Sequence, residues 1–481
     1  MMKSTPPEIW REIFQWFTKH QDYILHVGST MEPAFVISQT CCQWREIATE
    51  ICPFLWSSFS VSLPCIKYPE EERNVTYVVD AVLARTGEEN LQIEFSGVDI
   101  GIYCPASLQI FKRILSYACR WESVAFYLPP NHSHLLEAKQ SVLRNLHKAR
   151  VSADPFSTYF PFRISGDCPC LEQIAFEGLP CHVEILLPFH HLTTFRDERM
   201  ELDLFVYELY LHILRNATAL DTFATIHGKT SDFDPPTANQ RINCNTLRSL
   251  TTSSGPILGS VVTPNLQKIQ VEFYDPETDT ESSCIEEVDH EYGARIEQTI
   301  NAIQVLVAIP KLTTSSHLTE IHLSDVGLHA QLTTLLQSTI YLKTLTVELS
   351  RWTPVYDRIL QQLLSLLNRV SVNANGSSLV LPELQSLTLD VFDTNGVATL
   401  NWVDISLPDV LDMRWSKITN RSLRNVHIEV ASSKTSFPNL MQAIARRLLK
   451  CRRRGQKVDI CVADEVGAIV VDFVQDIAVH S

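Results

Sequence analysis

The sequence predicts an α/β protein in which a small helical module, residues 4–60, precedes an irregular array of helices and parallel strands over residues 61–481. Two observations predict this fold class. Apolar residues in the first part recur with the 3.6-residue period of amphipathic helices. Farther along, short strand-like segments alternate with helix-periodic segments, and this alternation favours parallel strands joined by right-handed crossovers.

The first predicted helix begins near Thr5, which can cap it, with Glu8 three residues later as in a capping box and proline at the first helical position. Its apolar side chains span about 160° at 100° per residue, more than the roughly 100° stripe of an ordinary surface helix. They are Ile9, Trp10, Ile13, Phe14, Trp16 and Phe17. We therefore expect this helix to pack on its own module and also to dock on a second protein.

The second predicted helix covers residues 35–51, where apolar positions again repeat with helical spacing. Cys52-Pro53 is expected to end it. The apolar hook Phe54-Leu55-Trp56 and a strand-like segment, residues 58–63, follow.

Three segments of this module, taken in order, resemble the F-box in the form common in large fungal families. They are TPPEIWREIF (5–14), TCCQWREIA (40–48) and Leu55-Trp56. The family pattern is roughly LPxEI..IF, then VCRxWRxIA, then LW. The chain departs from it at Thr5, which replaces a leucine, and at Thr40, which replaces an apolar residue.

The resemblance implies that the module binds a Skp-type adaptor, which links F-box proteins to a cullin scaffold. It also implies a set of residues that either face the adaptor or form the helical core behind that face: Pro7, Ile9, Ile13, Phe14, Cys41, Trp44, Leu55 and Trp56. Trp10 is a further docking candidate, because aromatic anchors dominate interface energies. The alternative is a three-helix cap that shields the end of a repeat array.

The strand-like segments share the pattern L-x-x-apolar-x-apolar. The strong copies begin at Leu171, Leu266, Leu318, Leu342, Leu384 and Leu423, and the weaker ones at Trp121, Leu192, Leu220 and Leu247. Helix-periodic stretches at residues 202–217, 296–309 and 355–370 lie between them. These units resemble leucine-rich repeats, whose usual period is about 20–29 residues.

The repeat spacing is irregular, from 19 residues (Leu247 to Leu266) to 52 (Leu266 to Leu318), so the long gaps need a missed copy or an insertion. The family's Asn or Cys after the strand is absent; residue 326, for instance, is Val. The sequence therefore predicts an irregular leucine-rich-repeat-like solenoid with parallel strands, and an ordinary α/β domain is the alternative.

Two charged segments have open interpretations. Residues 275–291 hold eight acidic residues and no Lys or Arg, which favours a solvated loop between repeats or an electrostatic arm for a basic client. Residues 445–457 are rich in Arg and Lys. They fit the exposed end of a final helix, or an import or anion-binding patch.

Composition and charge narrow the functional classes. The formal net charge is −15, whereas proteins that bind nucleic acid or anionic membranes need a broad basic surface, so we expect neither partner. The thirteen scattered cysteines favour reduced thiols in a cytoplasmic or nuclear protein. The sequence shows no signal peptide and no run of about 18 apolar residues that predicts a membrane span.

Motifs for bond chemistry are incomplete. Gly228-Lys229-Thr230 resembles the end of a P-loop, but Phe223 stands where the first glycine belongs. His290-Glu291 begins like HExxH, but Ala294 replaces the second zinc ligand. The histidine pairs at 132/134 and 190/191 lack neighbouring ligands at metal spacing, so we interpret them as surface or core residues. We predict no catalytic residue, no cofactor and no metal ligand.

The expected function is therefore that of a substrate-recognition subunit of an SCF-type (cullin-based) ubiquitin ligase. The module would bind the Skp-type adaptor, and the strand-lined face of the array would bind an unknown client protein. One alternative is a repeat scaffold that binds a partner with no ligase role. Another is a hydrolase whose triad is assembled from residues remote in sequence.

Overall fold

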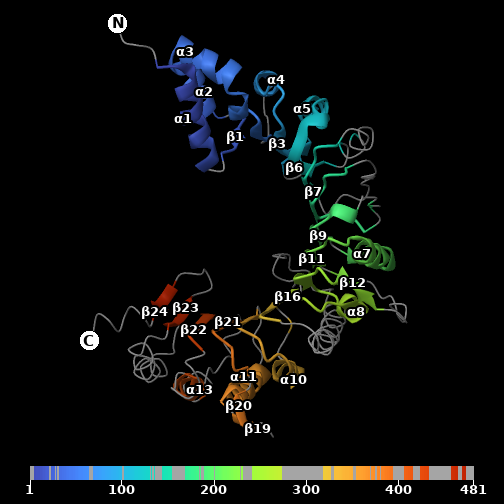
Figure 1. Ribbon diagram of the computed structural model, residues 1–481, viewed down its shortest axis with the longest axis vertical. Coiled ribbons are helices and arrows are strands. Elements are labelled where there is room, and N and C mark those ends of the chain that lie inside the picture. The colour runs from blue at the N-terminus through green and yellow to red at the C-terminus, as the bar shows by residue number, and fades with distance from the viewer. Residues whose placement is uncertain are drawn as a thin grey trace, which may run out of the picture. The chain divides into compact units, whose positions relative to one another are not determined.

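The computed structural model describes most of residues 5–272, 318–349, 354–432 and 457–472; the longer gaps are 136–142, 154–167, 231–240, 273–317, 394–405, 415–422 and 433–456. The chain forms two compact units, residues 1–220 and 221–481. Figure 1 labels many of their helices and strands.

The first unit begins with a helical module. Its elements are α1 (Pro7–His20), α2 (Pro33–Thr40), α3 (Cys42–Glu46), a π-helical turn (Ile47–Ile51) and a 3-10 turn (Pro53–Leu55). The module is joined to a sheet, because the short strand β1 (Leu25–His26) pairs in parallel with β2 (Ser58–Ser62). The predicted module boundary at residue 60 thus falls inside a strand.

The rest of the first unit is a parallel sheet whose strand order follows the sequence. After β2 come β3 (Leu91–Ser96), β6 (Trp121–Leu128), β7 (Lys148–Ala153), β8 (Gln173–Glu177) and β9 (Thr194–Glu198). The helices are α4 (Pro69–Arg85), α5 (Pro105–Leu115) and α7 (Leu204–Asn216), and β4 (Val98–Asp99) and β5 (Ile102–Tyr103) form a small hairpin.

The second unit repeats this arrangement. Its sheet contains β11 (Thr222–Thr225), β14 (Ser249–Thr252), β16 (Lys268–Glu272), β17 (Glu320–Ser324), β18 (Thr344–Leu349), β21 (Ser386–Asp393), β22 (Asn425–Ser432) and β23 (Lys457–Ala463). These strands pair in parallel in sequence order, and only β24 (Ile469–Asp472), at the end of the sheet, pairs antiparallel. The protein is therefore mixed α/β with extensive parallel pairing.

The other described elements of the second unit cover or flank that sheet. The helices are α8 (Gly255–Ser260), α10 (Ala330–Ser338), α11 (Pro354–Leu367) and α13 (Leu407–Arg414). Two small sheets pair β13 (Ile242–Asn243) with β15 (Val261–Val262) and β19 (Val370–Asn373) with β20 (Gly376–Leu379). The buried guanidinium of Arg414 on α13 donates to the carbonyls of Leu367 and Leu381, which ties α13 to the end of α11.

Burial alternates along strands such as β8 and β18, with one face buried and the other partly open to water. Helices pack on the buried face: on α5, Phe111 contacts Phe95 of β3 and Phe126 of β6, with ring centroids 5.1 and 5.3 Å apart. On α7, Tyr210 lies 6.0 Å from the ring of Phe195 on β9. The opposite, more open face of the strands carries no such helices among the elements described above.

A repeated turn explains why the leucine pattern marks each strand. The N–H of the leading leucine donates to the carbonyl three residues earlier, as in Leu342 to Thr339 and Leu384 to Leu381. The carbonyl of the residue before one strand accepts the N–H groups of two successive residues at the start of the next strand. The Lys343 carbonyl, for example, accepts from Gln385 and Ser386. The leucine side chain is buried at each copy, so the pattern encodes a turn and a core position together.

All ten pattern copies precede or lie in strands, which confirms that part of the prediction. The helices predicted at 202–217 and 355–370 are α7 and α11. The helix predicted at 296–309 lies outside the described residues. So do the acidic segment 275–291 and nearly all of the basic segment 445–457. Across the 52-residue gap, β16 pairs directly with β17, so no further strand of the sheet lies between these two.

The predicted second helix, 35–51, is wrong as a single element. It breaks at Cys41, whose backbone is extended (φ −159°, ψ 167°), and resumes as α3 and the π-helical turn. The Cys41 thiol accepts the Trp44 N–H at 3.4 Å and so caps α3. Arg45 donates to the Ser38 carbonyl at 2.8 Å, which satisfies a backbone group that the break leaves open.

Candidate functional site

The helix α1 buries one face inside the helical module. Phe14 is 4% exposed. Its ring lies 5.8 Å from that of Trp44 on α3, and Trp10 packs edge-on against Trp44 at 4.6 Å. This aromatic cluster fixes α1 against α3. Trp10 and Trp44 remain half-buried, so each ring reaches the module surface.

The other face of α1 leaves large apolar side chains in water. Ile9, Ile13 and Trp16, at helical spacing of four and then three residues, are 50%, 46% and 63% exposed. We call these three residues the α1 stripe. Val36 on α2 is also 45% exposed. A row of exposed isoleucine and tryptophan on one helix is typical of a protein-binding surface, because soluble monomers seldom leave contiguous apolar side chains open.

Leu55 and Trp56 lie in the interior behind this surface, 1% and 0% exposed. The Trp56 indole N–H donates to the Ala48 carbonyl at 2.7 Å, a backbone group of the π-helical turn. The guanidinium of Arg85 on α4 lies over the same ring, 4.5 Å from its centroid, and burial lowers the pKa of Arg85. Trp56 therefore joins the helical module to the start of the sheet.

The structure separates the two roles that the sequence left open for the candidate residues. Exposed candidates are Pro7, Ile9, Ile13 and Cys41; half-buried ones are Trp10 and Trp44; buried ones are Phe14, Leu55 and Trp56. The buried three form core contacts and do not reach the surface. Trp16 and Val36 were missed as site candidates, although Trp16 continues the i, i+4, i+7 spacing begun by Ile9.

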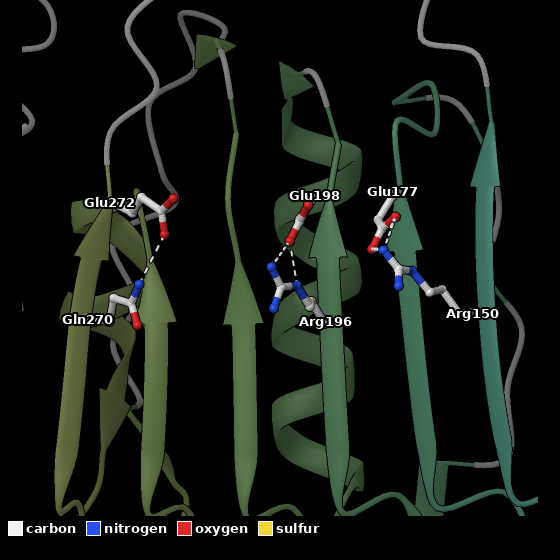
Figure 2. Close-up of polar contacts among 6 residues, drawn as sticks. All are labelled: Arg150, Glu177, Arg196, Glu198, Gln270 and Glu272. Carbon is white, nitrogen blue, oxygen red and sulfur yellow. Dashed lines mark hydrogen bonds and ion pairs between the residues drawn. The ribbon is translucent and has the colours of Figure 1, made fainter. Parts of the chain in front are cut away.

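A second candidate surface is the open face of the sheets. In the first unit, Arg150 on β7 pairs with Glu177 on β8 at 2.7 Å, and on β9 Arg196 pairs with Glu198. Figure 2 shows these four side chains on one face of the strands. In the second unit, the Gln270 amide donates to the Glu272 carboxylate at 3.1 Å. Alternating charges of this kind suit recognition of a polar partner more than bond chemistry.

One serine–histidine pair has the spacing of a nucleophile and base. The Ser107 hydroxyl lies 2.8 Å from Nε2 of His132, but both residues are fully buried. A substrate cannot reach this hydroxyl, so we assign the pair a structural role in packing α5 against the segment after β6. The histidines at 190 and 191 are exposed, as the sequence allowed.

Comparisons with protein-family models and with curated protein sequences find no match for this chain. Among the residues that the structure describes, no helix is long and apolar enough to cross a membrane.

Proposed function

We propose that the chain is a substrate-recognition subunit of a cullin-based ubiquitin ligase. The helical module binds a Skp-type adaptor through the α1 stripe, and the open sheet face binds a client protein. The chain itself performs no bond chemistry. It raises the effective concentration of the client's lysine near a ubiquitin-loaded enzyme, which is a positional form of catalysis.

The observation that carries this proposal is the α1 stripe on a module whose sequence resembles the F-box. The resemblance supplies the partner class. The 50% and 46% exposure of Ile9 and Ile13 supplies a surface whose burial is favourable, at about 25 cal/mol per Å² of apolar area. The half-buried Trp10 beside it can contribute the aromatic anchor on which interface energies commonly depend.

The aromatic cluster supports docking for a second reason. Because Phe14 and Trp44 hold α1 in place through ring contacts of 5.8 Å, the stripe is presented on a rigid helix. Preorganised surfaces lose less conformational entropy when they bind.

Co-purification of the tagged full-length chain from eukaryotic cells tests the proposal. Wild type should recover a Skp-type adaptor and a cullin. The double variant I9S/I13S should lose both, because it removes the apolar contacts without touching the core. The matched control is L204S/F205S on α7, whose side chains are 48% and 49% exposed. This control should recover adaptor and cullin as wild type does.

Two outcomes contradict the proposal: no adaptor with the wild-type chain, or equal recovery with I9S/I13S and the control. Recovery of other proteins without adaptor or cullin would favour the alternative, a repeat scaffold with no ligase role. Circular dichroism of both double variants checks that their helical content is unchanged.

A further inference from the structure

The open face of the second unit carries a row of carboxylates on three adjacent strands. In register, Glu348 of β18 lies opposite Asp390 of β21, and Asp390 lies opposite Glu429 of β22. Neighbouring strands are about 4.8 Å apart, so the three carboxylates are near neighbours. Like charges opposite one another destabilise a sheet unless a cation lies between them.

Two histidines lie on the same face in the adjacent register row, where His322 of β17 is opposite Thr346 and His427 of β22 is opposite Thr388. The Nε2 of His322 on β17 is 2.9 Å from the Glu348 carboxylate. The Nε2 of His427 on β22 is 3.6 Å from the Glu429 carboxylate. His427 also occupies the same face of its strand as Glu429, two residues away, so its ring borders the carboxylate row.

Asp390 is at the centre of the row. Its Oδ1 is buried and has no hydrogen-bond partner among the residues that the structure describes. A carboxylate oxygen in this environment is stabilised when a cation binds to it.

The ligand atoms of Asp390, His427 and Glu429 all lie within 4.8 Å of one another. Zinc binds histidine nitrogen and carboxylate oxygen at about 2.0–2.2 Å. Small changes in side-chain rotamer bring three such atoms around one ion. Two of the ligands come from one strand and the third from its neighbour, so the backbone fixes their relative positions.

We propose that Asp390, His427 and Glu429 form a binding site for a divalent transition-metal ion, with Zn²⁺ as the preferred species. The imidazole ligand favours zinc, cobalt or nickel over magnesium and calcium, which prefer oxygen ligands alone. The bound ion neutralises the carboxylate row and links β21 to β22. Three protein ligands leave at least one coordination position for water or a further carboxylate.

Titration of the full-length, chelator-treated protein tests this site. Zn²⁺ binding is measured by calorimetry, and Co²⁺ binding by visible absorption. We expect one equivalent of metal whose affinity falls at least about tenfold in H427N and in D390N, since even indirect ligand changes cost 10–100-fold. Zinc should also raise the melting temperature of wild type more than that of either variant.

The matched control is H147N in the first unit. His147, directly before β7, also lies beside a glutamate, 3.5 Å from Glu172, but among the described residues no third metal-ligating side chain is grouped with this pair. This variant should bind Zn²⁺ as wild type does, which separates the proposed site from adventitious binding by other histidines and cysteines. Equal zinc affinity and stoichiometry in wild type, H427N and D390N would overturn the proposal, as would no zinc binding by wild type.

Discussion

The residue that departs most from the repeating core is Asp197. Core positions in register across β3, β6, β7 and β8 hold Phe95, Phe126, Val151 and Phe176, and the next position, on β9, is Asp197. Its carboxylate pairs with Arg199 at 2.8 Å, and both side chains are fully buried. Arg199 also donates to the carbonyls of Cys181 and Val183. The sequence TFRDE reads as an ordinary charged strand, so this pair could not be predicted without the register.

Removing one partner of this pair should be costly. R199M leaves a buried carboxylate uncompensated, and we expect a loss of about 3–5 kcal/mol in the free energy of unfolding. The double variant D197L/R199M restores the apolar character of the row and should recover most of that loss. Urea denaturation followed by tryptophan fluorescence measures both. Equal destabilisation by the single and double variants would show that the ion pair itself is required.

Stability should depend on pH through the same carboxyl. Burial raises the pKa of Asp197 to about 6, with Arg199 opposing the shift. Because the folded pKa lies above the unfolded one, the folded state binds more protons between these values, and stability falls as pH rises through this window. The unfolding free energy of wild type minus that of D197N should therefore decrease from about pH 4 to about pH 6. A difference that rises or stays flat over this range contradicts the assignment.

At the scale of elements, the L-x-x-apolar-x-apolar pattern predicted strands well because the leading leucine serves both the turn and the core. It missed β3 and β7, where Leu91 starts the strand directly and Ala149 replaces the usual large residue. It also missed the break at Cys41, because the 3.6-residue period continues through the break. Only hydrogen bonds such as that from Arg45 to Ser38 reveal it.

The repeat pattern predicts that substitutions on the two faces of one strand change the free energy of unfolding by very different amounts. Leu345 on β18 is fully buried, whereas its neighbour Thr346 lies on the open face. L345A should lower the free energy of unfolding by about 2–5 kcal/mol. T346A should change it by less than about 0.5 kcal/mol. Similar denaturation midpoints for the two variants would contradict the assigned face.

A comparison of W56A with W16A tests which tryptophan of the helical module is buried and which is exposed. Trp56 is fully buried and donates to the Ala48 carbonyl, so W56A should destabilise the module by about 3–5 kcal/mol. W16A alters a side chain that is 63% exposed and should be nearly neutral for stability. Thermal unfolding followed by circular dichroism provides the measurement. A large loss with W16A would place Trp16 in the core and weaken the case for the α1 stripe.

At the scale of the whole molecule, composition and pattern predicted the α/β class and the parallel strands. They could not predict two compact units or the insertions between paired strands, because the strand pattern carries no information about what lies between its copies. The proximity of Asp390, His427 and Glu429 could not be predicted either. These residues come from two strands, so no local motif marks them.

The affinity of the purified full-length chain for a purified Skp-type adaptor tests the central claim most directly. Calorimetry should give measurable binding by wild type and by L204S/F205S. I9S/I13S should bind at least about 30-fold more weakly, corresponding to about 2 kcal/mol for loss of an interface hot spot. Equal affinities for all three proteins, or no binding by wild type, would contradict the assignment of the α1 stripe as an adaptor surface.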